Sequence, residues 1–278
     1  MPKTEEFIKV SIITVVYNDI AHIAQTIESI LSQTYPNIEY IIIDGDSTDG
    51  TKEIIQNYID TKPACFKHSI TKFVSEKDKG VYDAMNKAMK FANGEWCNFM
   101  NSGDIFHKNT TIEEIFREYQ KLSDKKISVF YGDVRIIFDT KHSKIVKSAP
   151  NNYKCHHRFN LNHQSAFINT KIQKIYPYDT RFKIAADSDF FTKIYHLGHK
   201  FQKFEIVVCD FNLEGISSSL SWKIFSEFCT IGYKYNKLYP IMLGTKYIFW
   251  NIPRTILRNL LPKKYRNFAR VKFGAKKQ

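Results

Sequence analysis

The segment KVSIITVVYN, residues 9–18, decides the fold because it joins an apolar run to a polar turn. Residues 9–16 are mostly β-branched and too few for a helix, which predicts a strand buried on both faces. Isoleucines then recur at helical spacing until Tyr35-Pro36, where the proline ends the helix. A strand, a short turn and a helix make the first unit of an α/β fold.

The same unit repeats as far as residue 104. Further strands are predicted at 39–43, 72–75 and 96–100, and helices follow Thr51 and span Val81 to Ala92, before Asn93-Gly94. We therefore expect a mostly parallel sheet flanked by helices. Beyond residue 104 we expect helices at 110–122 and 186–197, and strands within 128–138, at 144–147, 165–168 and 203–209.

Polar clusters directly follow the first four predicted strands. They are Tyr17-Asn18, Asp44 to Ser47, Glu76 to Gly80 and Asn101 to Asp104. Taken singly, each cluster could consist of turn or helix-cap residues. Because the carboxyl ends of parallel strands share one edge, we expect the clusters to converge there. Carboxylates at such an edge can hold a divalent cation and accept a proton from a hydroxyl.

Several motifs in order resemble those of family 2 glycosyltransferases, which have the GT-A (Rossmann-like) fold and invert the anomeric configuration. Residues 10–104 resemble the donor-binding half, and the whole resemblance covers roughly residues 8–218. The matching stretches are SIITVVYN (11–18), IIIDGDSTDGT (41–51), SEKDKGVYDAMNKA (75–88), NFMNSGD (98–104), NHQSAF (162–167), AADSDFF (185–191) and EGISS (214–218).

The resemblance implies a role for each matching position. Asp104 would bind Mn²⁺ or Mg²⁺, Asp187 would be the general base, and His163 and Gln164 would approach the diphosphate or the acceptor. Asp44 or Asp46 would form a hydrogen bond with the nucleobase or the ribose of the donor. The other positions implied or placed at the nucleotide-sugar site are Thr14, Tyr17, Asn18, Glu76, Asp78, Lys79, Gly80, Asn86, Asn101, Ser102 and Gly103.

Two positions depart from the family pattern. Asn101 stands where many relatives have a carboxylate, so the metal motif brings less charge to a cation. Ala186 replaces the glutamate of the Glu-Asp pair but leaves Asp187 in place. Because of these losses, an alternative function is that of a catalytically impaired relative, which binds nucleotide sugar without transferring it.

The positive charge is concentrated at the C-terminal end. The chain has 41 Lys and Arg and a net charge of +13. Thirteen of these basic residues lie in residues 220–278, together with a single acid, Glu227, so this segment carries nearly all of the net charge. We expect a transferase domain over 1–219, with a nucleotide half at about 8–106 and an acceptor half at 107–219, and a basic amphipathic helical region at 220–278. Apolar, aromatic and basic residues of 247–278 favour contact with an anionic membrane, although a helix docked on the protein's own core is the alternative.

Other classes of protein fit less well. The five cysteines are scattered without a Cys-x-x-Cys motif, which argues against a disulfide framework or structural zinc. No uninterrupted apolar run could span a membrane, and no secretory signal is evident, so we expect a cytoplasmic location at the inner membrane face. The first strand lacks the G-x-G-x-x-G turn of dinucleotide enzymes.

The expected activity is that of a hexosyl- or hexosaminyltransferase making bacterial surface polysaccharide or glycolipid. It would transfer the sugar of a nucleotide-diphospho-sugar, with UDP favoured, to a saccharide or lipid-linked acceptor hydroxyl. The basic residues also suit a nucleic-acid or anionic-surface binding protein. We do not expect a nucleic-acid partner, because no recognised binding motif accompanies them and the acidic sheet edge would repel phosphates.

Overall fold

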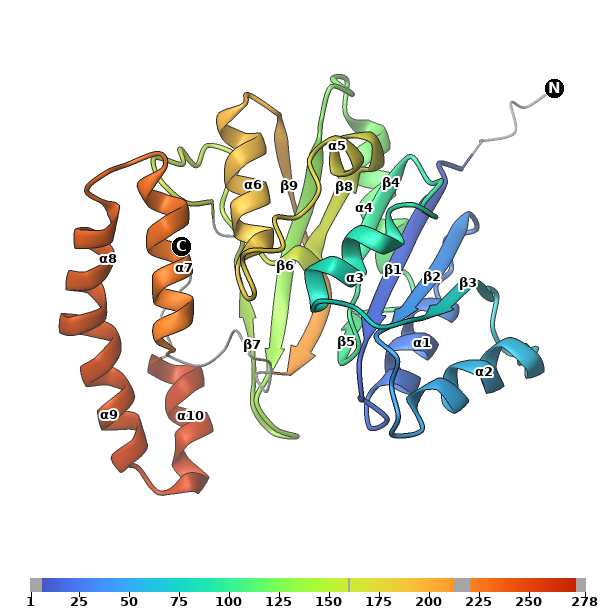
Figure 1. The fold of residues 1–278 in the computed structure, drawn as a ribbon, viewed down its shortest axis with the longest axis horizontal. Helices are drawn as coiled ribbons and strands as arrows, with labels where there is room; N and C mark the ends of the chain where they lie inside the picture. The colour runs from blue at the N-terminus through green and yellow to red at the C-terminus, as the bar shows by residue number, and fades with distance from the viewer. Residues whose placement is uncertain (1–6, 160, 213–220, 274–278) are drawn as a thin grey trace.

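A computed structural model describes residues 7–159, 161–212 and 221–273. Within them nine strands form one sheet in the order β3-β2-β1-β4-β8-β6-β9-β5, with β7 paired to β6. Helices cover both faces of the sheet, and the C-terminal helices stand beside α6 at one end of it (Figure 1). The α/β sheet flanked by helices that the sequence predicts is confirmed.

The first half of the sheet is parallel. Its strands are β1 (Val10–Val16), β2 (Ile38–Asp44), β3 (Ile70–Ser75) and β4 (Trp96–Phe99), and the helices between them are α1 (Ile23–Leu31), α2 (Thr51–Thr61) and α3 (Val81–Ala88). All seven residues of β1 are buried, as its apolar composition predicts for a central strand. Helix α3 ends at Ala88, four residues earlier than predicted.

The second half is mixed, so the parallel arrangement that we expected holds mainly for the first four strands. Strand β6 pairs with β9 in parallel and with β7 and β8 antiparallel, while β4–β8 and β5–β9 are antiparallel. The elements are β5 (Asp104–Phe106), α4 (Thr111–Lys121), β6 (Val129–Ile137), β7 (Ser143–Val146), η1 (His163–Ser165), β8 (Ala166–Asn169), α5 (Thr170–Ile175), α6 (Ala186–His196) and β9 (Phe201–Asn212).

A short connection makes the sheet curl. Only four residues, Met100 to Gly103, separate β4, in the middle of the sheet, from β5, the last strand in its order. Gly103 adopts φ +90°, a left-handed conformation that favours glycine, and its N–H donates to Thr26 Oγ1 on α1 at 3.0 Å. This turn places Asp104 on β5, opposite Phe211 of β9.

Each face of the sheet has its own hydrophobic core. One core is formed with α3 and α6 and includes Met85, Phe99, Phe190 and Phe191. The other is formed with α1 and α4 and includes Ile27, Phe116 and Phe130. The two cores fix the strands between them, so the loops at the strand ends are held by a rigid frame.

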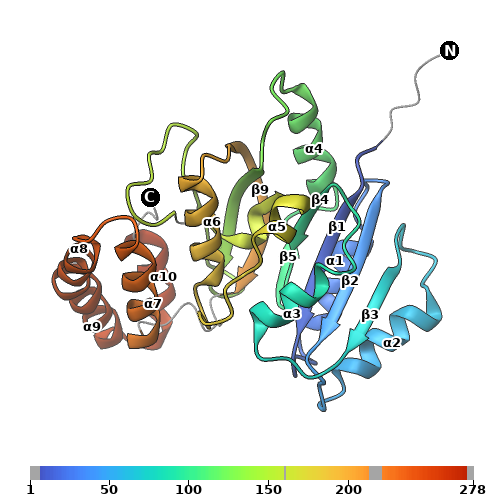
Figure 2. The ribbon, with the colours of Figure 1, turned by 45° about the horizontal axis from the view of Figure 1, so that its top comes forward.

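Within residues 221–273, four helices and one π-helical turn follow the sheet: α7 (Trp222–Tyr233), α8 (Tyr239–Lys246), η3 (Tyr247–Asn251), α9 (Ile252–Leu260) and α10 (Lys263–Phe273). They form a group next to α6, at the opposite end of the molecule from β3 and α2 (Figure 2). Pro253 has no N–H to offer the preceding turn, which accounts for the π-helical turn where α8 runs into α9.

The C-terminal helices differ in how far they are buried. Ile231 of α7 is fully buried and belongs to the core that α6 shares, whereas α9 contributes no buried residue. Among the described helices, none combines the length and apolar character that crossing a bilayer requires. The boundary that we expected near residue 219 and the EGISS stretch lie outside the described residues.

Candidate active site

Hydrogen bonds join the loops that follow the first strands. Asn18 N–H donates to Ser47 Oγ at 2.8 Å, and Asn18 Oδ1 accepts from Thr48 N–H at 2.9 Å. The loop after β4 joins the same network, because Ser102 Oγ donates to Asp19 Oδ2 at 2.6 Å. The predicted convergence of the strand-end clusters at one edge is therefore confirmed.

Three residues from the loops after β1, β2 and β3 pack against one another at that edge. Gly45 lies between the Tyr17 ring and the Asp78 carboxylate: a Cβ atom on it would lie 2.6 Å from Asp78 Oδ2 and 3.2 Å from Tyr17 Cδ2. The Tyr17 side chain is 64% exposed, so its ring is available to a planar ligand. Asp78 Oδ1 also accepts Gly80 N–H at 2.7 Å, which fixes the carboxylate.

Three predicted site residues are directed into the protein. Thr14 is fully buried and its hydroxyl donates to Met100 O at 2.7 Å. Asp44 is also fully buried, and its carboxylate accepts Ser47 N–H at 3.0 Å and the Ser75 hydroxyl at 2.6 Å. Asn86 bonds both backbone groups of Tyr178, at 2.8 and 2.9 Å. All three side chains brace the loops. The burial of Thr14 and Asp44 corrects our expectation that they contact the nucleotide, whereas Asn86 was expected only nearby, on the helix that follows.

Other predicted residues lie at the margin of the edge. Asp46 adopts φ +68° and pairs with Lys52 at 2.9 Å, and Glu76 pairs with Lys87 at 2.9 Å. Lys79 is exposed, and its N–H donates to Asp83 Oδ2 at 3.0 Å. Gly80 begins α3 with φ +119°. Asp46 and Glu76 are thus already paired with lysines at this margin.

A chain of hydrogen bonds links the acid predicted as general base to the metal motif. His163 Nδ1 donates to Asp187 Oδ2 at 3.2 Å, while Asn101 Nδ2 donates to His163 Nε2 at 3.0 Å. Asp187 Oδ1 also accepts the Tyr82 hydroxyl at 3.1 Å and Ser188 N–H at 2.8 Å. Residues from α3, the loop after β4, η1 and α6 thus meet at one point.

The environment keeps Asp187 ionised. Burial raises its pKa, but the hydrogen bonds from His163, the Ser188 N–H and the Tyr82 hydroxyl outweigh burial and hold that pKa below its usual range. Burial lowers the pKa of His163, but Asp187 and Asp104 leave it above its usual value. The pair therefore presents a carboxylate that can accept a proton.

Asp104 and Asn101 together fit a hard cation. Burial raises the pKa of the Asp104 carboxyl to about 6, against the lowering effects of His163 and the Gln164 side chain. Asn101 Oδ1 is buried and has no hydrogen-bond partner, so it is an oxygen donor without an assigned contact. Among the described residues, no cluster of three or more His, Cys, Asp or Glu could hold a metal. A cation here would need further oxygen ligands from phosphate or water.

Comparison with known proteins identifies this arrangement. The profile of "Glycosyl transferase family 2" matches residues 11–195, well over half of the chain. The chain belongs to glycosyl transferase family 2. The match contains every predicted site residue.

The family 2 chain resembles bacterial polysaccharide enzymes in sequence. It is 34% identical over 141 residues to the UDP-Glc:alpha-D-GlcNAc-diphosphoundecaprenol beta-1,3-glucosyltransferase WfaP of Escherichia coli, covering 51% of this chain and 52% of that protein. It is 38% identical over 102 residues to the putative teichuronic acid biosynthesis glycosyltransferase TuaG of Bacillus subtilis, covering 36% and 38%. The matched regions thus span about half or less of these relatives.

Solved structures of low sequence identity share the fold. S. aureus TarS in complex with UDP superposes with a TM-score of 0.61 at 16% identity, covering 93% of this chain and 77% of that one. The mannosyltransferase PcManGT of Pyrobaculum calidifontis, with GDP-Man and Mn²⁺, gives 0.61 at 18% identity, covering 88% and 71%. The GT-A fold expected from the sequence motifs is confirmed.

The structure places two further residues, not predicted from the sequence, beside the predicted ones. The Tyr82 hydroxyl donates to Asp187 and to Ile184 O, the latter at 2.8 Å. The only sequence signal for Tyr82 was its position within the SEKDKGVYDAMNKA motif. Gly45 stands between two predicted residues, and its close contacts with Tyr17 and Asp78 were not evident from turn chemistry alone.

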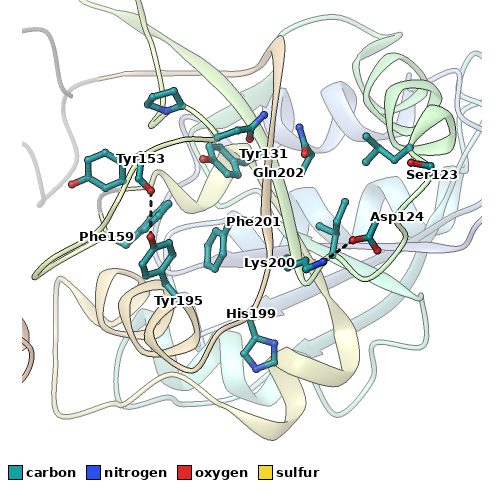
Figure 3. Close-up of a pocket in the computed structure, with 14 residues that line it drawn as sticks. Ser123, Asp124, Tyr131, Tyr153, Phe159, Tyr195, His199, Lys200, Phe201 and Gln202 are labelled. Atoms are coloured by element: carbon teal, nitrogen blue, oxygen red, sulfur yellow. Dashed lines mark hydrogen bonds and ion pairs between the residues drawn. The ribbon is translucent and has the colours of Figure 1, made fainter.

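A cavity of about 380 Å³ lies apart from this site (Figure 3). It opens among the starts of β6 and β9 and the end of α6, and none of the predicted site residues lines it. Tyr131 and Phe159 in its wall are almost fully buried, and Asp124 pairs with Lys200 at its margin at 2.6 Å. The cavity is therefore not part of the strand-end site.

Proposed function

We propose that this chain transfers a sugar from a nucleotide-diphospho-sugar to an acceptor hydroxyl, with inversion at the anomeric carbon. The observation that carries the proposal is the Asp187–His163–Asn101 hydrogen-bond chain, which ends at the Asp104 metal motif on the strand-end edge. A carboxylate base beside a cation site is what a single displacement requires.

In this mechanism the acceptor oxygen attacks the anomeric carbon from the face opposite the diphosphate. Asp187 accepts the proton of the acceptor hydroxyl, and its fixed position comes from three donors: His163, Tyr82 and Ser188. His163 and Gln164 lie between this base and Asp104, where the diphosphate or the acceptor would pass. Bond formation to the acceptor and cleavage of the sugar–phosphate bond then occur together.

A bound Mg²⁺ or Mn²⁺ would offset the charge that develops on the diphosphate leaving group. Asp104 and the Asn101 carbonyl would hold it, since a carboxylate and an amide oxygen suit a hard cation. The Mn²⁺ in the PcManGT complex supports this cofactor.

The donor that we propose is a UDP-sugar, because TarS binds UDP and UDP-GlcNAc and WfaP is a UDP-glucose enzyme by name. Tyr17, Gly45 and Asp78 would receive the nucleotide, with Asn18, Ser102 and Gly103 nearby. The acceptor would be a saccharide or lipid-linked saccharide of a surface polysaccharide, since WfaP acts on a diphosphoundecaprenol-linked sugar.

A donor screen tests the activity. UDP-, GDP- and TDP-sugars would be titrated with and without Mn²⁺ while melting is followed, and transfer of radiolabelled sugar to a GlcNAc-diphospholipid would be measured. We expect a metal-dependent rise in melting temperature with UDP-sugars and a glycosidic product. Binding with donor hydrolysis but no glycosidic product would instead favour the impaired relative that Asn101 and Ala186 suggest.

We further propose that the chain acts at the cytoplasmic face of the membrane, held there by its C-terminal helices. Along α8, η3 and α9 an apolar stripe at helical spacing is open to solvent: Leu238, Ile241, Ile248, Phe249, Ile252, Ile256 and Leu260, with Phe249 77% and Leu260 76% exposed. Apolar side chains in such numbers on one stripe suit the interface of a bilayer.

Positive charge on the last two helices also supports contact with an anionic surface. Arg254 and Arg258 of α9 lie near Arg266 and Arg270 of α10, and burial together with their charges lowers the pKa of Arg258. Arg258 Nε is buried without a hydrogen-bond partner among the described residues. Phosphate groups of anionic lipids would be attracted to this concentration of arginines.

Vesicle flotation tests the membrane contact. The full chain would be mixed with phosphatidylglycerol-rich or purely zwitterionic vesicles, and Phe249→Ser combined with Leu260→Ser would be compared with Ile175→Ser. Ile175 is 63% exposed on α5, away from the stripe, so it is the matched control. We expect only the double variant to lose salt-sensitive flotation. Equal flotation of all three proteins would reject the contact.

A further inference from the structure

One carboxylate of the C-terminal helices receives three consecutive backbone N–H groups from the loop before α6. Glu227 Oε1 accepts Lys183 N–H at 2.9 Å, and Glu227 Oε2 accepts Ile184 N–H at 3.0 Å and Ala185 N–H at 2.9 Å. Glu227 lies on α7 and is the only acid in residues 220–278. The acid in this otherwise basic region therefore has a specific structural partner.

The loop that it holds leads directly into the proposed base. Ala185 is the N-cap residue of α6 and provides no side-chain cap, and Asp187 lies in the first turn of that helix. Tyr82 Oη donates to Ile184 O at 2.8 Å and to Asp187 Oδ1 at 3.1 Å. The Ile184 residue is thus fixed at its N–H by Glu227 and at its carbonyl by the same hydroxyl that contacts the base.

Packing fixes Glu227 in turn. On the same face of α7, Ile224 is 3% exposed and Ile231 is fully buried, so the helix cannot shift without opening the core. One turn past Ile231, Lys234 Nζ pairs with Asp189 Oδ1 of α6 at 2.7 Å. Contacts from α7 and its C-cap therefore lie on both sides of Asp187 in the sequence: Glu227 binds residues 183–185, and Lys234 binds Asp189.

We propose that Glu227 is a positioning residue for Asp187, so that helix α7 of the C-terminal region completes the active site. This inference rests on the proposed function, in which Asp187 accepts the acceptor proton. Glu227 contacts neither donor nor acceptor in this mechanism. It acts by setting where the first turn of α6 begins, and hence the distance from Asp187 to the attacking oxygen.

The three contacts require a carboxylate. Both oxygens of Glu227 accept, and hydrogen bonds to an ionised acceptor are about twice as strong as neutral ones. In Glu227→Gln one oxygen becomes an NH₂ group, which would face at least one backbone N–H as a second donor. The loop must then move away from α7, and a base displaced by about 1 Å can lose on the order of a hundredfold in rate.

The test compares Glu227→Gln with Glu118→Gln in the full chain. Glu118 pairs with Lys121 on the surface of α4, so its variant also removes one paired carboxylate but leaves α6 untouched. The assay uses UDP-glucose with Mn²⁺ and a GlcNAc-diphospholipid acceptor. We expect Glu227→Gln to lower kcat about 10- to 100-fold with the KM and Kd for UDP-glucose unchanged, and Glu118→Gln to match the wild type.

Hydrogen exchange provides a readout that needs no substrate. In the wild type the amides of residues 183–185 are hydrogen-bonded to Glu227, and we expect them to exchange faster in Glu227→Gln while the core peptides of β1 stay protected. A wild type without transfer would contradict the proposed function instead. An active wild type matched by Glu227→Gln in kcat, or unchanged exchange of residues 183–185, would overturn the inference.

Discussion

Replacing Asp187 by Asn tests the proposed chemistry most directly, because the substitution removes a proton acceptor while keeping its shape. In the structure Asp187 Oδ1 accepts from Tyr82 and Ser188, and Oδ2 accepts from His163. An amide oxygen in the Oδ1 position would keep the first two contacts. Its NH₂ group would then donate to His163 Nδ1, provided that the imidazole changes tautomer and the Asn101 amide rotates.

The expected loss follows from the role of the base. Because general-base catalysis contributes roughly 10²- to 10⁴-fold, Asp187→Asn should lower kcat by that factor, or about 3–5 kcal/mol in activation free energy. Donor affinity should stay near that of the wild type, since Asp187 lies across His163 from the metal motif. Packing is conserved, so the melting temperature should change little.

The assay is radiolabelled transfer from UDP-glucose with Mn²⁺, accompanied by calorimetric titration of UDP. His163→Gln provides a comparison, because it disturbs the orientation of Asp187 but leaves the carboxylate in place. It should lose less activity than Asp187→Asn. Near-normal turnover of Asp187→Asn would refute the assignment of the base, whereas lost UDP affinity would place the side chain in donor binding.

Two further predictions concern the strand-end edge, and a third concerns the stability of the opposite end of the sheet. Gly45→Ala would put a Cβ 2.6 Å from Asp78 Oδ2, so the Kd for UDP should rise about tenfold by calorimetry, and an unchanged Kd would remove Gly45 from the nucleotide site. Asn101→Asp should tighten Mn²⁺ binding about tenfold or more by adding a charged ligand, and equal titration curves would place the metal elsewhere. Burial raises the pKa of Glu39, but hydrogen bonds from Asn93, Lys9 and Ser11 outweigh it and leave the pKa lowered. Glu39→Gln should therefore cost about 1–3 kcal/mol of unfolding free energy at neutral pH, and the difference should shrink as pH falls below about 4; a difference independent of pH would contradict this linkage.

The sequence predicted the donor half of the molecule well because its signals are local. The strand at residues 10–16 is continuous and apolar, and the polar residues after each strand are bound to converge once the strands are parallel. The same logic could not tell which polar side chains face outward. Thr14 and Asp44 lie on or at the end of strands buried on both faces, so no alternation of polar and apolar residues marks their direction.

The acceptor half was harder to predict because its pairings join distant segments. Strand β5 has three residues, too few for any periodicity, and β8 pairs antiparallel with β4 across about seventy residues of chain. The contact between His163 and Asp187 depends on that arrangement and not on their spacing. Glu227 gave no signal beyond being the lone acid in a basic segment, and its role is visible only when α7 is placed beside α6.

The hold of α7 on the loop at 183–185 has a consequence for engineering. Chimeras of family 2 enzymes that exchange acceptor specificity would be designed most simply by joining one protein's GT-A core to another's C-terminal helices at the segment before α7. In this protein such a junction would take Glu227 from one parent and the three backbone amides that donate hydrogen bonds to it from the other. Parents would need to be matched at both places, or the crossover moved ahead of residue 183, so that the loop, α6 and α7 are inherited as one block.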